Sequence, residues 1–397
     1  AYGDPARSLA LIGVTGTNGK TTTVGIIRHL LDEPERRAAT IGTLGVLIGS
    51  DGVELPGGSG LTTPGPVELQ RTLRALVDRG VRSVAMEVSS HSLDQRRVES
   101  LAFDAVVFTN LTRDHLDYHQ SVEAYFDAKA KLLTYLRPGG IAAINADDAA
   151  WERLPHLPNE LRFGVAHSAP DAVWASAIDF APRGTSFTIS LPIAAARGPV
   201  PFVGTVHLPL VGDFNIANAL GAASAALAVG QSPAVIAARL STVPQVPGRL
   251  ELINESPSVL RDYAHTPDAL RRALDAVRPF ARGKLIVVFG AGGDRDRGKR
   301  PEMGAVAAQH ADHAIVTSDN PRTEDPERIL DDIEAGMNGA RHQRIADRRA
   351  AIAAALAAAG PDDVIVLAGK GHETYQIRGT TKHPFDERIV VRELMRS

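Results

Sequence analysis

"GVTGTNGKTTTVGIIRHLL", residues 13–31, is the stretch that most directly indicates the fold of this chain. It ends a short apolar run and opens a helix-like run, with a lysine and threonines between the two. The Walker A loop, G-x-x-x-x-G-K-[ST], places a lysine and a hydroxyl at the start of a helix. Here Gly19, Lys20 and Thr21 match that pattern, whereas Val14 takes the position of its first glycine. An ordinary tight turn with a surface lysine is the alternative, which the flanking strand and helix disfavour.

A loop of this kind binds phosphates through its backbone. Glycines let the N–H groups turn toward an anion, the helix start adds positive charge, and the lysine ammonium neutralises the outer phosphates. We therefore predict a nucleotide-binding loop made of Gly16, Thr17, Asn18, Gly19, Lys20, Thr21 and Thr22.

Composition excludes several classes of protein. With 44% hydrophobic and 22% charged residues, the chain is typical of a soluble globular protein. It has no cysteine, which excludes disulfides, thiol nucleophiles and thiolate metal sites. Its net charge of −3 disfavours nucleic-acid binding, and its longest apolar runs are too short to insert into a membrane. We expect a cytoplasmic monomer that acts on small molecules.

Strand-like and helix-like segments alternate, which predicts an α/β fold in two domains. Residues 1–243 are expected to form a phosphate-loop domain with a mainly parallel sheet and a small antiparallel patch. Residues 244–397 are expected to form a Rossmann-like α/β domain. The expected strands are 8–16, 83–90, 104–111, 140–147, 285–290, 313–320 and 362–369, with the antiparallel patch at 185–210, and a helical stretch is expected at 226–244.

Polar side chains at the ends of these strands suggest a metal site. Glu87 stands at the end of one strand, and "TNLTRDHLDYH", with Asp114, His115, Asp117 and His119, comes at the end of the next. Carboxylate, imidazole and phosphate groups can together hold Mg²⁺ or Mn²⁺. Each residue alone could equally be a helix cap or a surface group, and the His-rich run could also suggest zinc.

The loops of the second half offer groups of both charges. They are "VVFGAGGDRDRGKR" (287–300), "TSDNPRTEDP" (317–326) and "LAGKGHETYQ" (367–376). Arginines there can pair with a carboxylate, while Asn and Glu side chains can hold an ammonium, so an amino acid is the expected ligand. A dinucleotide loop is the alternative, but Arg295 stands where its third glycine is needed.

The stretch T-G-T-N-G-K-T-T at 15–22 resembles the nucleotide loop of the Mur ligase family, which joins a carboxylate to an amine at the expense of ATP. The resemblance implies ATP and Mg²⁺ as cofactors and an acyl phosphate intermediate. It implies Lys20, Glu87, His115 and Lys129 as catalytic residues, and Thr21, Glu87, His115 and a carbamate on Lys129 as metal ligands. Lys131 is the rival for that carbamate. It also implies nucleotide contacts from Asn215, Asn218, Arg249 and Asp262, while Arg261 departs from the apolar residue expected beside Asp262.

The motifs D-N-P-R (319–322) and G-K-G-H-E (369–373) resemble the branch of the family that adds meso-diaminopimelate to UDP-MurNAc-L-Ala-D-Glu in peptidoglycan synthesis. That resemblance implies amino-acid contacts from Arg295, Asp319, Asn320, Arg322, Gly369 and Glu373. "GSGLTTPGP" (58–66) and "SSHSLDQRR" (89–97) resemble the segments that hold the uridine-diphosphate acceptor, through Thr62, Thr63, Ser89, Gln95 and Arg97.

Two other functions remain open at this stage: a related ligase for another amino acid (L-lysine or a folylpolyglutamate type), and a non-catalytic nucleotide-binding scaffold. Members of the family begin with a smaller domain that binds the uridine nucleotide. This sequence reaches its phosphate loop after only a short leading segment, so we expect that domain to be missing from the chain.

Overall fold

The computed structural model describes residues 2–56, 60–166, 168–181, 183–195 and 198–396, without the side chains of 116, 117, 194, 195 and 198–200. The chain divides into two compact units. Unit 1 comprises residues 1–179, 185–209 and 213–244, and unit 2 comprises residues 180–184, 210–212 and 245–397.

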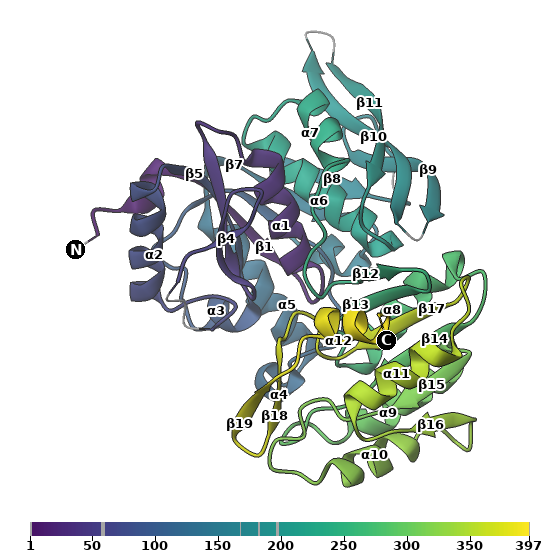
Figure 1. Ribbon diagram of the computed structural model, residues 1–397. Helices are drawn as coiled ribbons and strands as arrows, with labels where there is room; N and C mark the ends of the chain where they lie inside the picture. Colours follow the sequence, from purple (N-terminus) through teal and green to yellow (C-terminus); the bar gives the residue numbers. More distant parts are fainter. Residues whose placement is uncertain (1, 57–59, 167, 182, 196–197, 397) are drawn as a thin grey trace. The chain divides into compact units, whose positions relative to one another are not determined.

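Unit 1 is built on one large sheet, which has eleven strands within the described residues. The strands are β1 (Ala10–Thr15), β2 (Arg37–Gly42), β3 (Gly45–Ile48), β4 (Val53–Glu54), β5 (Val81–Glu87), β6 (Phe103–Phe108), β7 (Leu136–Asn145), β8 (Glu160–Gly164), β9 (Val173–Ala181), β10 (Gly184–Ala195) and β11 (Gly198–Leu208). Their order is β11-β10-β9-β8-β7-β6-β1-β5-β2-β3-β4, and Figure 1 shows β11, β10 and β9 side by side. From β2 to β9 the neighbouring strands run parallel, and the β2–β3, β3–β4 and β10–β11 pairs are antiparallel.

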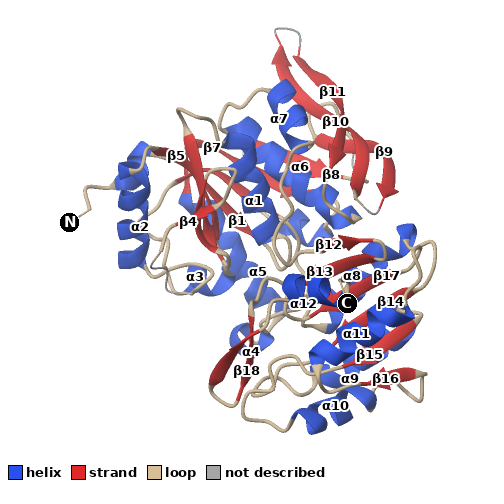
Figure 2. Ribbon diagram, viewed as in Figure 1, coloured by secondary structure: helices blue, strands red, loops and turns tan. Residues whose placement is uncertain are grey.

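Helices cover both faces of this sheet (Figure 2). The helices are α1 (Lys20–Leu31), α2 (Pro66–Asp78), α3 (Ser90–Asp94), α4 (Leu116–His119), α5 (Val122–Ala130), α6 (Asp213–Ala228) and α7 (Pro233–Leu240), with 3₁₀ turns at Pro5–Ser8, Lys131–Tyr135 and Ala149–Arg153. α1 and α6 pack against each other, and α6 lies over β6, β7 and β8. It lies so close that a methyl group on Gly221 would stand 3.0 Å from the ring of Phe163. This spacing explains why small residues fill the middle of α6.

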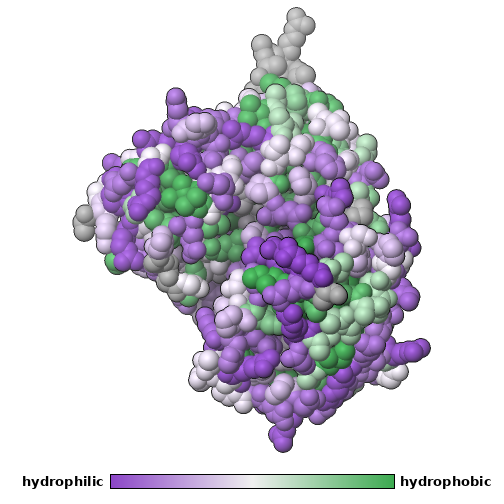
Figure 3. Space-filling view, in the orientation of Figure 1, coloured by the Kyte–Doolittle hydropathy of each residue, from purple (hydrophilic) through white to green (hydrophobic). Residues whose placement is uncertain are grey.

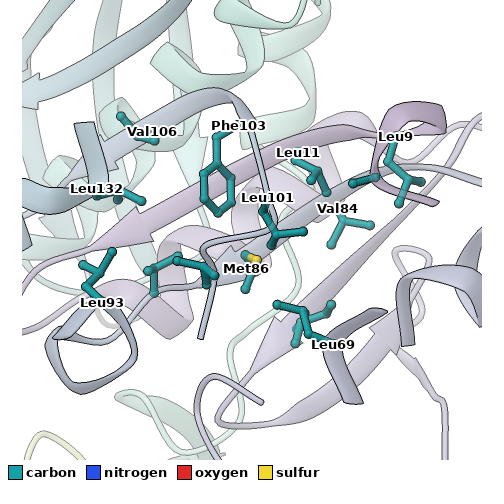
Figure 4. Packing of buried hydrophobic residues seen from close by; sticks show 14 of the residues in the cluster. Leu9, Leu11, Leu69, Val84, Met86, Leu93, Leu101, Phe103, Val106 and Leu132 are labelled. Carbon is teal, nitrogen blue, oxygen red and sulfur yellow. The ribbon is translucent and has the colours of Figure 1, made fainter. Parts of the chain in front are cut away.

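The opposite face carries the main apolar core of unit 1. Figure 4 shows Leu11, Val84, Met86 and Phe103, from the three central strands, packed with Leu69 of α2. Because β1, β5 and β6 are covered on both faces, their sequences are almost continuously apolar, as is usual for buried parallel strands.

Unit 2 has a six-stranded sheet and a separate hairpin. The strands are β12 (Glu251–Glu255), β13 (Ser258–Asp262), β14 (Leu285–Phe289), β15 (His313–Val316), β16 (His342–Arg344), β17 (Val364–Ala368), β18 (Tyr375–Arg378) and β19 (Thr381–Pro384). The sheet order is β12-β13-β17-β14-β15-β16, and β18 pairs with β19. The helices are α8 (Pro267–Val277), α9 (Lys299–His310), α10 (Pro326–Glu334), α11 (Arg348–Ala358) and α12 (Glu387–Leu394), with a 3₁₀ turn at Arg278–Phe280. α11 and α12 close one apolar core over β13, β14, β15 and β17.

Arg261 links three elements of unit 2. Its guanidinium is 1% exposed and donates to Glu251 Oε2 at 2.7 Å and to Asp386 Oδ1 at 3.4 Å. The same Glu251 oxygen accepts from the backbone N–H of Gly248 at 2.7 Å, and Asp386 caps the first turn of α12. A charged residue therefore stands at this strand position because it ties the turn before β12 to α12.

The expected α/β architecture, its mainly parallel first sheet and its antiparallel patch are confirmed. The expected strands are present, although most end a few residues earlier than expected. The stretch 226–244 is two helices rather than one, since Gly230 adopts φ +90° between α6 and α7. The short strands β2–β4, β8, β9, β12, β13, β16, β18 and β19 were not among those expected.

Hydrophilic residues cover much of the visible face, with hydrophobic ones in smaller patches (Figure 3). Among the described residues, none of the helices has both the length and the apolar character needed to cross a membrane.

The Arg261 ion pairs predict a local effect on stability. Arg261→Met should lower the free energy of unfolding by about 3 kcal/mol, because it removes the buried cation that pairs with the largely buried carboxylate of Glu251 and leaves Asp386 with Arg388 alone. Urea unfolding followed by circular dichroism measures this loss. Trp151 and Trp174 both lie in unit 1, so their fluorescence reports the unfolding of unit 1. Because Arg261 lies in unit 2, the substitution should leave this unfolding transition unchanged.

The matched control is Arg388→Met, which removes a second arginine from the same Asp386 carboxylate. Its side chain is 44% exposed, so the expected loss is below about 1 kcal/mol. Equal losses for the two variants would contradict the role assigned to burial.

Candidate active site

The loop between β1 and α1 is clamped by the residues that follow β6. Thr17 N–H donates to the Asn110 backbone oxygen at 2.7 Å, and Asn18 N–H donates to Asn110 Oδ1 at 2.9 Å. Thr109 Oγ1 donates to Asn18 O at 2.7 Å. A Cβ on Gly16 would collide with this Thr109 hydroxyl, so only glycine allows the approach. The clamp fixes the loop before any ligand arrives.

Two lysines meet at the same loop carbonyl. Lys20 Nζ donates to Gly16 O at 2.9 Å and Thr17 O at 2.8 Å, while Lys129 Nζ, from α5, donates to Gly16 O at 2.7 Å. Lys129 is 1% exposed and its Nζ lies 4.4 Å from the centre of the Tyr125 ring. Burial lowers the pKa of Lys129 well below its ordinary value, and the charge of Lys20 lowers it further. This shift favours the neutral amine of Lys129 over its ammonium form.

The first turn of α1 lies against α6 of the same unit. Thr21 and Thr22 are buried on its first turn. Gly19 precedes them with φ +85°, and a Cβ there would collide with Asn218 Oδ1 of α6. Asn218 Nδ2 donates to Asn215 Oδ1 at 3.0 Å, so the two amides expected to bind the nucleotide base form one pair beside the loop.

Glu87 is held at the end of β5 with 1% of its surface exposed. Thr43 donates to both of its oxygens, from N–H to Oε1 at 2.8 Å and from Oγ1 to Oε2 at 3.2 Å. The Thr43 hydroxyl lies 3.3 Å from that of Thr62, and Thr63 Oγ1 donates to the Glu87 backbone oxygen at 2.9 Å. The T-T-P loop is thereby brought beside Glu87, while residues 58 and 59 of the same stretch lie outside the described part of the chain.

The remaining residues expected to hold the acceptor continue this cluster. Arg97 Nη1 donates to Thr63 O at 2.8 Å, and Arg97 Nε donates to Gln95 Oε1 at 2.9 Å. Ser89 N–H donates to Thr63 Oγ1 at 3.2 Å, and Ser89 Oγ caps α3. The structure therefore brings Thr62, Thr63, Ser89, Gln95 and Arg97 together.

His115 lies in an aromatic group that sequence reasoning did not foresee. It is exposed, with φ +53°, and its ring centre lies 4.7 Å from that of His91 and 6.2 Å from that of Tyr125. His115 Nε2 lies 3.6 Å from Asp114 Oδ2. Within the described residues, no three His, Asp or Glu side chains gather as metal ligands, and the Asp117 side chain lies outside them. Lys131 instead pairs with Asp94 at 3.0 Å.

In unit 2, Arg249 and Asp262 come together at the turn before β12. The Arg249 guanidinium lies 5.1 Å from the centre of the Tyr263 ring. Asp262 accepts from the N–H groups of Leu250 and Ala264, both at 2.8 Å. Burial raises the pKa of Asp262, and the positive charge of Arg249 opposes this shift.

The loops after β15 and β17 meet at the residues expected to bind an amino acid. Asn320 Nδ2 donates to Glu373 Oε2 at 2.8 Å, and a Cβ on Gly369 would stand 2.9 Å from Asp319 Oδ2. Lys370, which the sequence analysis did not single out, donates to both Asn320 Oδ1 and Glu373 Oε2 at 3.1 Å. The sequence feature that could have identified Lys370 is its position between two glycines in the G-K-G-H-E motif.

Two of the expected arginines flank Gly292. A Cβ on this glycine would stand 3.0 Å from Arg322 Nη1 and 3.6 Å from Arg295 Cγ. Arg322 adopts φ +53° and donates from Nη1 to Gly293 O at 2.8 Å. The β18–β19 hairpin holds its backbone on both sides, because Arg322 N–H donates to Ile377 O and Gly379 N–H donates to Arg322 O. Arg295 is exposed. Arg300, from the same basic stretch but in the first turn of α9, is buried and pairs with Glu324 and Asp332.

Residues 14–226 match the Mur ligase middle domain, and residues 248–371 match the Mur ligase, glutamate ligase domain. The chain belongs to the Mur ligase family. Among Mur ligases, it is 49% identical over 402 residues to the UDP-N-acetylmuramoyl-L-alanyl-D-glutamate–2,6-diaminopimelate ligase of Synechococcus elongatus, covering 98% of this chain and 76% of that protein. The enzyme of the same name from Geobacter metallireducens is 44% identical over 414 residues, covering 98% of this chain and 78% of that protein.

Solved Mur ligase structures share the fold. A structure of a UDP-N-acetylmuramoyl-L-alanyl-D-glutamate–2,6-diaminopimelate ligase is similar with a TM-score of 0.68 and 36% identity, covering 99% of this chain and 79% of that one. The ADP complex of folylpolyglutamate synthase from Mycobacterium tuberculosis has a TM-score of 0.71 at 21% identity, covering 93% and 89%. Family membership and these ligase relatives identify an ATP-dependent ligase.

The position of Gly19 predicts a loss of nucleotide affinity on substitution. In Gly19→Ala the new methyl group collides with Asn218 and the backbone is strained at φ +85°, so the affinity for ATP should fall by about tenfold or more. Isothermal titration calorimetry measures it.

Gly80→Ala is the matched control, since Gly80 adopts φ +79° with nothing within 4 Å of the added Cβ. It carries the same backbone strain without the collision, and ATP affinity should stay at the wild-type value. Wild-type affinity in Gly19→Ala would show that the contact with Asn218 does not shape the loop.

Proposed function

We propose that this Mur ligase joins meso-diaminopimelate to UDP-MurNAc-L-Ala-D-Glu, using ATP and Mg²⁺, in peptidoglycan precursor synthesis. The observation that carries the choice of amino acid is the group around Arg322. Arg322 and Arg295 lie beside Gly292, while Asn320 and Glu373 form a polar pair in the loops that meet there. Guanidinium groups suit the distal carboxylate of diaminopimelate, and a carboxylate beside an amide suits an ammonium.

The residues of unit 1 fit the ATP-dependent step. The β1–α1 loop with Lys20 binds the phosphates, and the Asn215–Asn218 pair binds the adenine. In unit 2, Arg249 and Asp262 are the residues proposed to contact a nucleotide. Thr62, Thr63, Ser89, Gln95 and Arg97 bind the acceptor near Glu87. Residues 1–243 then serve as the ATP-binding domain, and residues 244–397 serve as the amino-acid-binding domain.

The donor set in unit 1 suits Mg²⁺ once Lys129 carries a carbamate. Glu87, the Thr21 hydroxyl and His115 supply two oxygens and one nitrogen, whereas an ammonium on Lys129 would repel a cation. The lowered pKa of Lys129 favours the neutral amine, which is the form that reacts with carbon dioxide to give an anionic oxygen ligand. When bound, the metal neutralises charge on the transferring phosphoryl group.

The reaction has two steps. A D-glutamyl carboxylate oxygen of the acceptor bonds to the γ-phosphorus of ATP, the bond to the ADP oxygen breaks, and an acyl phosphate forms. The deprotonated amine of diaminopimelate then attacks the acyl carbon, the C–N bond forms, and inorganic phosphate leaves. Lys20 stabilises negative charge during the first step, and the group around Glu373 places the amine for the second.

Phosphate release tests this function. With ATP, Mg²⁺ and the UDP-MurNAc-dipeptide, release should depend on meso-diaminopimelate, and L-lysine should not replace it because lysine lacks the carboxylate that Arg322 would bind. Equal release with both amino acids would refute the specificity. No release with either would favour a non-catalytic nucleotide-binding scaffold.

Substitution of Arg322 should weaken the binding of meso-diaminopimelate. Arg322→Met should raise the KM for diaminopimelate by about tenfold or more, because a charged hydrogen bond to the distal carboxylate is lost. Arg322→Lys keeps the charge without the two-pronged geometry and should give an intermediate value. The KM for ATP should stay at the wild-type value in both.

Arg341→Met is the control, since Arg341 is an exposed arginine of the same unit. It should leave both KM values unchanged. An unchanged KM for diaminopimelate in Arg322→Met would place the distal carboxylate elsewhere.

A further inference from the structure

Lys370 is a charged residue whose side chain does not reach solvent. It follows β17 between Gly369 and Gly371, which adopt φ +114° and +53°. Its side chain is 0% exposed, and its Nζ donates to Asn320 Oδ1 and Glu373 Oε2, both at 3.1 Å. A group this enclosed acts on a ligand only through its neighbours.

Lys370 lies between two carboxylates, those of Asp319 and Glu373. Its Nζ lies 3.6 Å from Asp319 Oδ1, which has no hydrogen-bond partner within the described residues, and it also contacts the carboxylate of Glu373. The nearby buried Arg348 is engaged by Glu387 at 2.8 Å and by the Ala368 backbone oxygen at 2.9 Å. Lys370 is thus one cation between two carboxylates, and Lys299 also interacts with Asp319, so the carboxylate of Glu373 is the acceptor that suits an approaching ammonium.

The hydrogen bonds of Asn320 make its amide orientation depend on Lys370. Its Oδ1 accepts from Lys370 Nζ at 3.1 Å and from Ile377 N–H at 2.9 Å. With Oδ1 turned toward these two donors, Nδ2 must face Glu373 Oε2, to which it donates at 2.8 Å. Asn320 and Lys370 both converge on Oε2, which leaves Oε1 of Glu373 to accept from a ligand.

We propose that Lys370 is a positioning residue for the amine substrate: its buried ammonium orients Asn320 and Glu373 so that Oε1 of Glu373 accepts from the substrate ammonium. The assignment of that substrate rests on the proposed function, whereas the orientation of Asn320 and Glu373 by Lys370 does not.

Two measurements on Lys370→Met test the proposal. In the phosphate-release assay, the KM for meso-diaminopimelate should rise by about tenfold or more, while the KM for ATP stays near the wild-type value. In hydrogen exchange of the free protein, the Ile377 amide should exchange faster, because its acceptor Asn320 Oδ1 is no longer held. Lys284→Met, at an exposed lysine of the same unit, should change neither value.

A double-variant cycle separates positioning from loss of folding. If Lys370 acts through Glu373, Lys370→Met should change the KM for diaminopimelate by less than about twofold in a Glu373→Gln background, whereas a general loss of stability would act equally in both backgrounds. The double variant also lacks one of the two carboxylates that Lys370 neutralises, which favours its folding.

The outcomes distinguish this proposal from the proposed function. Wild-type protein that shows no response to diaminopimelate refutes the proposed function, and the exchange of Ile377 then decides the positioning role. An unchanged KM in Lys370→Met, unchanged exchange at Ile377, or equal effects of Lys370→Met in both backgrounds would overturn the positioning role.

Discussion

The close approach of two loops of unit 1, after β1 and after β6, is the constraint on which the phosphate site depends. Thr109 and Asn110 hold the backbone of residues 16–18 through direct hydrogen bonds, and Gly16 is small enough to permit the contact. Since these bonds are made by the protein itself, the loop does not have to be ordered by the nucleotide. Binding energy that would otherwise be spent on ordering the loop remains available for the reacting groups.

In unit 2, ion pairs of buried arginines hold the backbone of loops and turns in place. Arg300 holds Glu324, which in turn accepts from the backbone of Asp294 in the loop that carries Arg295. Arg261 holds Glu251 beneath the turn that carries Arg249. Each buried arginine is costly to desolvate and is retained with its carboxylate partner. In both cases, the buried pair sets the backbone from which another arginine extends.

The sequence alone predicted the architecture and which kinds of side chain stand at the candidate site. It did not predict which of these side chains are buried or which residues they contact. The long apolar strands and the G-K-T-T loop were clear, whereas β3 has four residues and β4 has two, which is too short to give a periodic signal. Arg295 and Arg300 belong to one basic stretch of sequence, yet Arg295 is exposed in a loop and Arg300 is buried on α9. The contact of Lys129 with Gly16 spans 113 residues, so no local pattern could reveal that both lysines share one carbonyl.

The backbone of Arg322 limits which residues can replace it, and with them how the amine specificity proposed for this enzyme can evolve. At φ +53° most side chains are disfavoured, while glycine and asparagine are tolerated, and the hairpin at 375–384 fixes this conformation from outside the motif. Exchange of Arg322 for a β-branched residue would therefore strain the turn as well as remove the guanidinium. Lineages that abandon the second carboxylate should pass through glycine or asparagine at this position, or should remodel the hairpin at the same time.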